Sequence, residues 1–139
     1  MRLLSPSTKA ARPGVAAVEL AILLPLLCFL FVITVDFARV FYYSVTITNC
    51  ASIGAVYASS DPTAANDSAG ILARVQKDAS NLDLQQLTVA STTNSSTNPT
   101  SVTVTVSYPF TTITNFPGVP SLTTLTRTVQ MNVTPFVPN

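Results

Sequence analysis

Histidine and tryptophan are absent from the 139 residues, and charged side chains are few, with seven Lys or Arg and six Asp or Glu. Without an imidazole, a Ser or Cys nucleophile lacks its usual general base, so the composition argues against a hydrolase of that kind. The chain also lacks the clustered Lys and Arg of a nucleic-acid-binding surface. We therefore expect a protein that is not an enzyme, needs no cofactor and binds no nucleic acid.

Cysteine is scarce as well, and its spacing excludes two further roles. Cys28 and Cys50 lie 22 positions apart, which on one continuous helix is about 33 Å. A disulfide needs Cα atoms within about 7 Å, and a structural zinc site needs four ligands. We expect two free thiols and no metal site. We also expect Cys50, outside the lipid, to react with a membrane-impermeant thiol reagent more readily than Cys28.

What the chain does have is a long apolar run. Residues 15–35 contain Glu19 as their only charged side chain, and 21 residues give a helix of about 31 Å, close to the thickness of a bilayer's hydrocarbon core. The run is longer than the apolar part of a cleavable secretory signal, and no small-x-small cleavage site follows it. Arg2, Lys9 and Arg12 precede it without an acid. The positive-inside rule therefore predicts a cytoplasmic amino end and an extracytoplasmic remainder.

The helix is expected to continue beyond the membrane over residues 36–60. Asp36 and Arg39 are three positions apart, the spacing of a helical ion pair, and are predicted to anchor the chain at the lipid interface. Tyr42 and Tyr43 follow and are expected at headgroup level. An apolar stripe at three- and four-residue steps is predicted from Phe37, Phe41, Val45, Thr48, Ala51, Ala55 and Ala58.

Residues 61–139 predict a small α+β head. Asp61-Pro62 should end the long helix, because the residue before proline is disfavoured in the α region. Strict alternation of apolar and polar residues predicts antiparallel strands, with Arg127 on the apolar parity and therefore near an edge. The expected elements are a short helix from residue 62 or 64 to about 80, strands over 86–91, 102–108 and 124–133, a polar turn over 92–99 and a surface loop over 109–121.

A combination of features also resembles a known family. The residues that carry it are GVAAVELAILLPLL from Gly14, VDFAR from Val35 and TNCASIGAVYA from Thr48. Basic residues, a glycine, a spaced glutamate and a proline-bearing span occur here in one order. The chain resembles the TadE-like pseudopilins of the tight-adherence (Flp-type) pilus system over about residues 12–59, and VTVTVSYPF at 102–110 resembles the family's later strand. Major subunits of that system are typically much shorter, so the resemblance implies a minor pilin-like subunit.

The resemblance implies processing and a set of partners. A prepilin peptidase would cut after Gly14 on the cytoplasmic side, so that residues 1–14 are a leader peptide and Val15 becomes the new amino terminus. Glu19 would then meet the ammonium of a neighbouring subunit during assembly. The implied partners are the peptidase, other pilins or pseudopilins, the inner-membrane assembly platform and membrane lipid. The implied location is the bacterial cytoplasmic membrane, crossed once, with incorporation into a pilus.

Other classes of protein remain open on the sequence. The chain could be an uncleaved single-pass anchor that presents a small extracytoplasmic binding domain, in which case Glu19 would only reach toward the cytoplasmic headgroups. A membrane-tethered enzyme would need a carboxylate pair, but the aspartates of the head are better explained as helix caps and solvated charges. A calcium site at Asp61, Asn66 and Asp67 lacks the spacing of a known calcium-binding loop.

Overall fold

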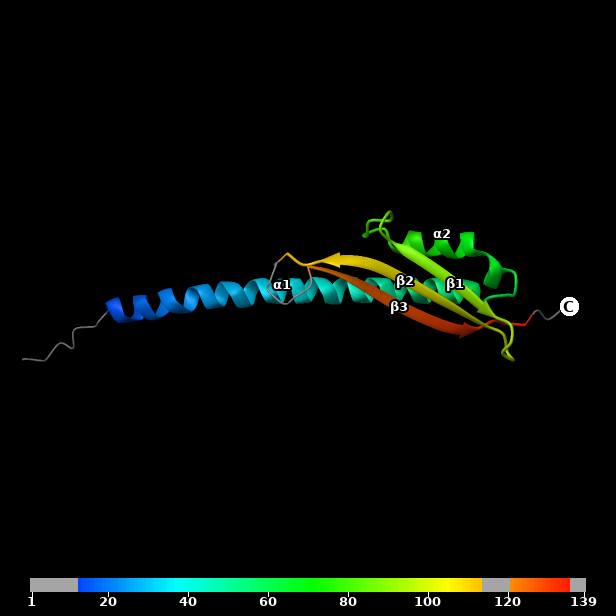
Figure 1. Ribbon diagram of the computed structural model, residues 1–139, viewed down its shortest axis with the longest axis horizontal. Helices are drawn as coiled ribbons and strands as arrows, with labels where there is room; N and C mark the ends of the chain where they lie inside the picture. Colours follow the sequence, from blue (N-terminus) through cyan, green and yellow to red (C-terminus); the bar gives the residue numbers. More distant parts are fainter. Residues whose placement is uncertain (1–12, 114–120, 136–139) are drawn as a thin grey trace, which may run out of the picture.

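The computed structural model describes residues 13–113 and 121–135. Figure 1 shows a long helix whose carboxyl-terminal half lies against a small head, while its amino-terminal half projects alone. The expected α+β fold, with a short second helix and a three-stranded antiparallel sheet, is confirmed. The elements are α1 (Pro13–Ala58), a 3₁₀ turn η1 (Ala64–Asn66), α2 (Ser68–Asp78), β1 (Thr88–Asn94), β2 (Ser101–Thr111) and β3 (Leu122–Asn132).

Helix α1 runs unbroken for 46 residues, as the sequence predicts, with Pro25 inside it. Proline removes one backbone hydrogen bond from a helix, and α1 continues through this position. The last turn is closed by the N–H of Ser59, which donates to the carbonyl of Ala55 at 2.9 Å. Pro62 follows shortly after, and it disfavours the α conformation at the residue before it. The predicted end of the helix is therefore confirmed.

The three strands form one antiparallel sheet in the order β1-β2-β3, so β2 is the central strand. Val104 of β2 lies opposite Ser91 of β1 and Val129 of β3. The predicted loop over residues 109–121 was wrong at its start, because β2 continues through Pro109 to Thr111. Pairing with β1 begins only at Ser107. Beyond that point β2 has no neighbour on the β1 side, so a missing N–H there breaks no ladder.

The two faces of β2 differ as the alternation predicts. Its inward side chains are buried, and they are Val102, Val104, Val106, Tyr108 and Phe110. On the other face, the hydroxyl of Thr105 bonds that of Thr128 at 3.0 Å, and Ser107 bonds Thr126 at 3.0 Å. Arg127 pairs with Val106 on the inward parity of edge strand β3 and is exposed. Its predicted place near an edge is confirmed.

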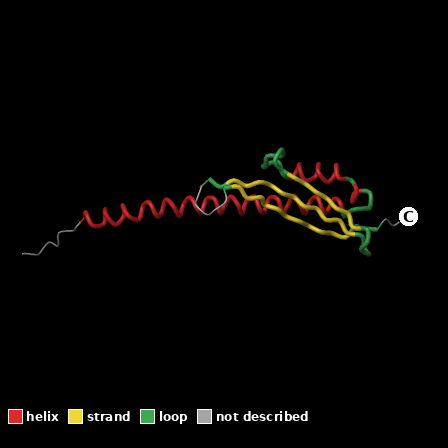
Figure 2. The backbone as a smooth tube through the Cα atoms, in the orientation of Figure 1, coloured by secondary structure: helices red, strands yellow, loops and turns green. Residues whose placement is uncertain are grey.

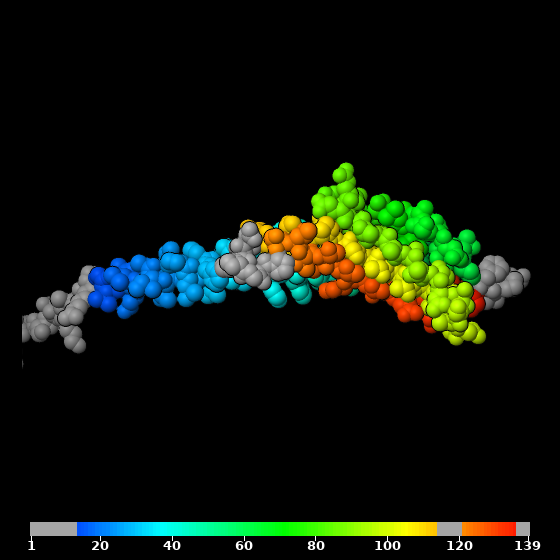
Figure 3. Space-filling model, in the orientation of Figure 1, coloured from blue at the N-terminus to red at the C-terminus, as the bar shows by residue number. Residues whose placement is uncertain are grey.

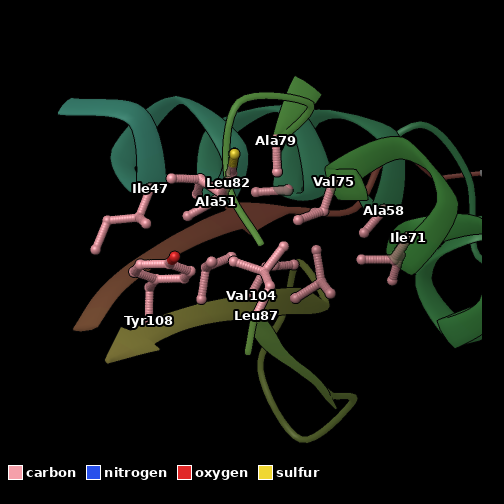
Figure 4. Close-up of a cluster of buried hydrophobic side chains, with 14 of the residues drawn as sticks. Ile47, Ala51, Ala58, Ile71, Val75, Ala79, Leu82, Leu87, Val104 and Tyr108 are labelled. Carbon is pink, nitrogen blue, oxygen red and sulfur yellow. The ribbon is translucent and has the colours of Figure 1, made fainter. Parts of the chain in front are cut away.

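Figure 2 shows the sheet, α2 and the second half of α1 side by side, and the buried side chains drawn in Figure 4 form the core between them. It combines small residues of α1 with larger ones from the other elements, among them Ala51, Ala55, Ala58, Ile71, Val75, Leu82 and Val104. A Cβ added at Gly54 would lie 2.9 Å from a methyl carbon of Val75 and 3.1 Å from one of Val104. Glycine at this position therefore allows α1 to approach both α2 and β2 closely.

The predicted apolar stripe of the outer helix was wrong in its first half. Phe37, Phe41 and Val45 are exposed, and the buried apolar residues of α1 instead begin at Ile47 and continue through Cys50. Because α1 is apolar on most sides, more than one of its faces shows apolar residues at three- and four-residue spacing. The sheet covers the series that is richest in small residues, because small side chains permit the closest packing against it.

The second helix was predicted as one element and is two. Asp67 separates η1 from α2, and its carboxylate accepts a hydrogen bond from the N–H of Gly70 at 2.9 Å. A side-chain cap of this kind starts a new helix and satisfies one of its free donors. Ile71 and Val75 of α2 are buried in the core, whereas Leu72 is exposed.

Candidate functional site

The amino-terminal half of α1 has no cover in the structure. Nearly every side chain from residue 14 to 35 is exposed, and most are large and apolar, including Leu20, Ile22, Leu26 and Phe31. Figure 3 shows this half as a bare rod extending from the head. By length and composition α1 qualifies as a helix able to cross a membrane. One such helix near the amino terminus fits a single-pass membrane protein.

The residues expected to be involved in processing and assembly lie on this bare half. Gly14 is within the first helical turn, and a Cβ built on it meets nothing within 4 Å. Val15 and Glu19 are four positions apart on the same helix, so their side chains lie on one face. Glu19 is exposed and makes no ion pair with any residue that the structure describes. The expected leader residues before Pro13 lie outside the described residues.

Asp36 and Arg39 form the ion pair that their spacing predicts, and they do more than that. Arg39 Nη1 lies 3.2 Å from Asp36 Oδ1. The same carboxylate oxygen accepts from the N–H of Ile113 at 3.0 Å, and Arg39 donates to the carbonyl of Thr111 at 3.3 Å. The guanidinium also lies 5.0 Å from the ring centre of Phe110. The pair therefore holds the end of β2 to α1, which sequence spacing could not reveal.

Cys50 lies inside the head and not on its surface. Its side chain is 0% exposed, and its Sγ lies 3.8 Å from a carboxylate oxygen of Asp78. Burial, together with the nearby Asp78 carboxylate, raises the pKa of the Cys50 thiol to about 11. Both cysteines are free, as expected. The expectation that Cys50 is the more reactive thiol does not fit its burial, since a reagent needs an accessible thiolate.

The aspartates of the head cap turns and helices. Asp61 Oδ1 accepts from the N–H groups of Thr63 and Ala64 at 2.7 and 2.9 Å, and these bonds lower the pKa of its carboxyl group. The Gly70 N–H and the Tyr57 hydroxyl similarly lower the pKa of Asp67. Within residues 13–113 and 121–135 no group of three His, Cys, Asp or Glu could hold a metal ion.

A shallow groove of about 320 Å³ runs between α1 and β3, and the sequence did not indicate it. Its lining is mostly apolar, with Phe37, Phe41 and Val45 from the helix and Arg127 from the edge strand. Arg127 donates to the carbonyl of Thr126 at 3.0 Å. These lining residues include no His, Asp or Glu that could act as a base for Ser44 or Thr48.

The fold and the bare helix define a class: a small α+β head carried on one helix long enough to span a membrane. A family model described as TadE-like protein matches residues 14–56. The chain is similar to this family over the part of α1 that contains Gly14, Glu19, Asp36 and Cys50, and the similarity supports an association with the tight-adherence system. No curated protein and no solved structure matches the chain.

Proposed function

We propose that the chain is a minor pilin-like subunit that takes part in assembly of a tight-adherence type IV pilus. The observation that carries the proposal is the bare half of α1, on which Glu19 is the single charged side chain between residues 15 and 35. The TadE-like match begins at Gly14 and covers this half together with the helix beneath the head. A helix that exposes so much apolar surface needs lipid or other helices around it.

Before assembly, residues 15–35 would cross the bacterial cytoplasmic membrane, with the basic residues Arg2, Lys9 and Arg12 on the cytoplasmic side. A prepilin peptidase would cut after Gly14, where the absence of a side chain leaves the bond accessible. Cleavage would create an ammonium group on Val15. The further partners are other pilins or pseudopilins and the membrane-embedded assembly platform.

Glu19 would supply the selectivity of assembly. When helices pack in a medium of low dielectric, its carboxylate would pair with the Val15 ammonium of a neighbouring subunit. Removing one member of a buried ion pair typically costs about 3–5 kcal/mol, because the other charge is left without a partner. A cost of that size is enough to decide whether a subunit enters a helical assembly.

The proposal is tested first by intact mass spectrometry of protein extracted from membranes of cells that contain the cognate peptidase. The expected mass is that of residues 15–139. Gly14→Leu should leave the 14.7 kDa precursor uncut. Since a Cβ at Gly14 meets nothing within 4 Å, this variant does not disturb the described fold. Ala21→Leu, an enlargement on the same exposed helix away from the bond, should be cut normally.

An unprocessed wild-type chain would contradict the proposal and favour the alternative, an uncleaved anchor presenting the head as a binding domain. A new terminus after residue 35 would contradict it in a different way, because the apolar run would then be a removed signal.

A further inference from the structure

The end of the head nearest the bare half of α1 is held at a defined position along the axis of that helix. The connection from β2 to β3 begins at Thr112, whose N–H donates to the carbonyl of Ser121 at 3.0 Å and closes the base of the hairpin. Asp36 accepts from the N–H of Ile113 at 3.0 Å, so this end of the hairpin lies at the helix turn that contains Asp36. Figure 1 shows the paired ends of β2 and β3 beside α1 at the boundary between its bare and covered halves.

This position along α1 coincides with the surface of a membrane that residues 15–35 would cross. A helix over residues 15–35 spans about 31 Å, which matches the hydrocarbon core, and the headgroup layer extends about 5–7 Å beyond it on each side. Asp36 is the first residue after the span, and Arg39 is about 4.5 Å further along the axis. With residues 15–35 in the hydrocarbon core, the hairpin end held by these two residues would fall at the level of the headgroup layer.

Three large apolar side chains are exposed at this end, among shorter polar ones such as Thr111 and Ser121. Ile113 is 63% exposed, Leu122 is 60% exposed, and Phe37, which directly follows Asp36 in α1, is 73% exposed. Leu122 lies opposite Thr111 in the β2–β3 register, so it is close to Ile113. From Ser101 to the carboxyl end the sequence contains no Asp or Glu. Water does not favour such a surface, whereas the apolar edge of a lipid headgroup layer does.

We propose that Ile113, Leu122 and Phe37 insert into the outer surface of the lipid bilayer that residues 15–35 cross, so that the head rests on the membrane before assembly. The inference rests on the proposed span but not on the proposed cleavage or the pilus partners. Its consequence is that a subunit must lift its hairpin end off the lipid when it leaves the membrane. The bilayer therefore fixes the orientation of the head before assembly.

The chain contains no tryptophan, so a single introduced indole reports its own depth. Ile113→Trp and Leu122→Trp variants of the full chain are reconstituted in phosphatidylcholine–phosphatidylglycerol vesicles that contain lipids brominated at shallow or deep acyl positions. Both variants should be quenched most strongly by shallow bromines, and their emission should be shifted to the blue. Both sites are exposed, so the larger ring meets no packed neighbour there.

Two matched variants calibrate the depth. Val56→Trp is on an exposed position of the same helix, about 30 Å beyond Asp36, and should show no quenching. Leu26→Trp lies near the middle of the bare half and should respond most to deep bromines. If the Ile113→Trp and Leu122→Trp variants are as little quenched as Val56→Trp, the proposal is wrong. It is equally wrong if Leu26→Trp is unquenched, since the helix would then not be in the bilayer.

A further variant distinguishes insertion from mere proximity. Ile113→Ser in the Leu122→Trp background removes one apolar side chain and leaves the indole in place. Insertion predicts a severalfold loss of quenching by shallow bromines, because only Phe37 and the introduced indole then remain to keep this end in the lipid. Unchanged quenching would mean that Ile113 contributes nothing and would overturn its assignment. None of these measurements requires the peptidase, so a failure of leader cleavage would not affect them.

Discussion

Two carboxylates on α1 have opposite surroundings. Asp36 is 7% exposed and accepts hydrogen bonds from Arg39 and from the Ile113 N–H, so its charge has protein donors. Glu19 lies 17 positions earlier on a helix without cover and forms no ion pair within the described residues. A charge in such an apolar segment is costly unless a partner is supplied from outside the chain. Asp36 thus serves the packing of the head against α1, and we propose that Glu19 finds its partner in another subunit.

Cys50 leads to a prediction about topology. At pH 8 a thiol with a pKa of about 11 is ionised in about one molecule in a thousand, and the thiolate is the reactive form. Native protein in intact spheroplasts should therefore remain unlabelled at Cys50 by a membrane-impermeant maleimide. Val56→Cys, at a position 58% exposed on the same helix, should be labelled from outside within minutes. Labelling is read by mass shift.

The same experiment has its own controls. In urea, Cys50 should become reactive, because both its burial and the contact with Asp78 are lost. Rapid labelling of Cys50 in the native protein would contradict the packing of α1 against α2. Labelling of Val56→Cys only after the membrane is permeabilised would reverse the proposed orientation.

Among the elements, strand β2 depends most on having two different faces. Val104→Asp places a carboxylate among Val75, Gly54 and the apolar neighbours of a fully buried site. We expect a loss of about 3 kcal/mol or more in the free energy of unfolding of the head, since a buried charge without a partner is among the most damaging substitutions. Thr105→Asp, one position along on the outer face, should cost about 1 kcal/mol.

Urea titration of the full chain in detergent, followed by pulse proteolysis, measures both variants. Thr105 loses only a hydroxyl contact with Thr128, so it is a matched control for a charge introduced in the same strand. Equal tolerance of the two substitutions would mean that the register of β2 against α1 is wrong.

Strands and helices were predicted from the sequence to different degrees. Period-two alternation identified β2 and β3 and their faces, because each strand has only two sides. For α1 the apolar series starting at Phe37 was as regular as the true one at Ile47, and only the shape of the sheet decides between them. The break between η1 and α2 depends on the Asp67 cap, a local contact that helical periodicity does not register.

At the scale of the whole molecule, one helix joins two environments. Length and composition were enough to predict that residues 15–35 would lie outside the head. The contact that fixes the position of the head along α1 could not be predicted, because Asp36 and Ile113 are 77 positions apart in the sequence. The groove beside Arg127 was missed for the same reason, as it forms only where α1 and β3 meet.

The central claim is that Glu19 acts in assembly and not in processing or anchoring. Glu19→Ala should be cut after Gly14 at the wild-type rate and remain in the membrane, yet recovery of the partner pseudopilin on co-purification should fall about 100-fold, the equivalent of about 3 kcal/mol. Glu19→Gln, which keeps the shape of the side chain but not its charge, should behave similarly. Glu19→Asp keeps the charge and should retain part of the function.

The deciding measurement is therefore partner recovery, scored beside leader cleavage in the same membrane extract. Cleaved Glu19→Ala protein without its partner is the result that the ion-pair mechanism predicts. Cleaved Glu19→Ala protein with normal partner recovery would contradict it, and would mean that Glu19 only reaches toward the headgroups from the end of the span.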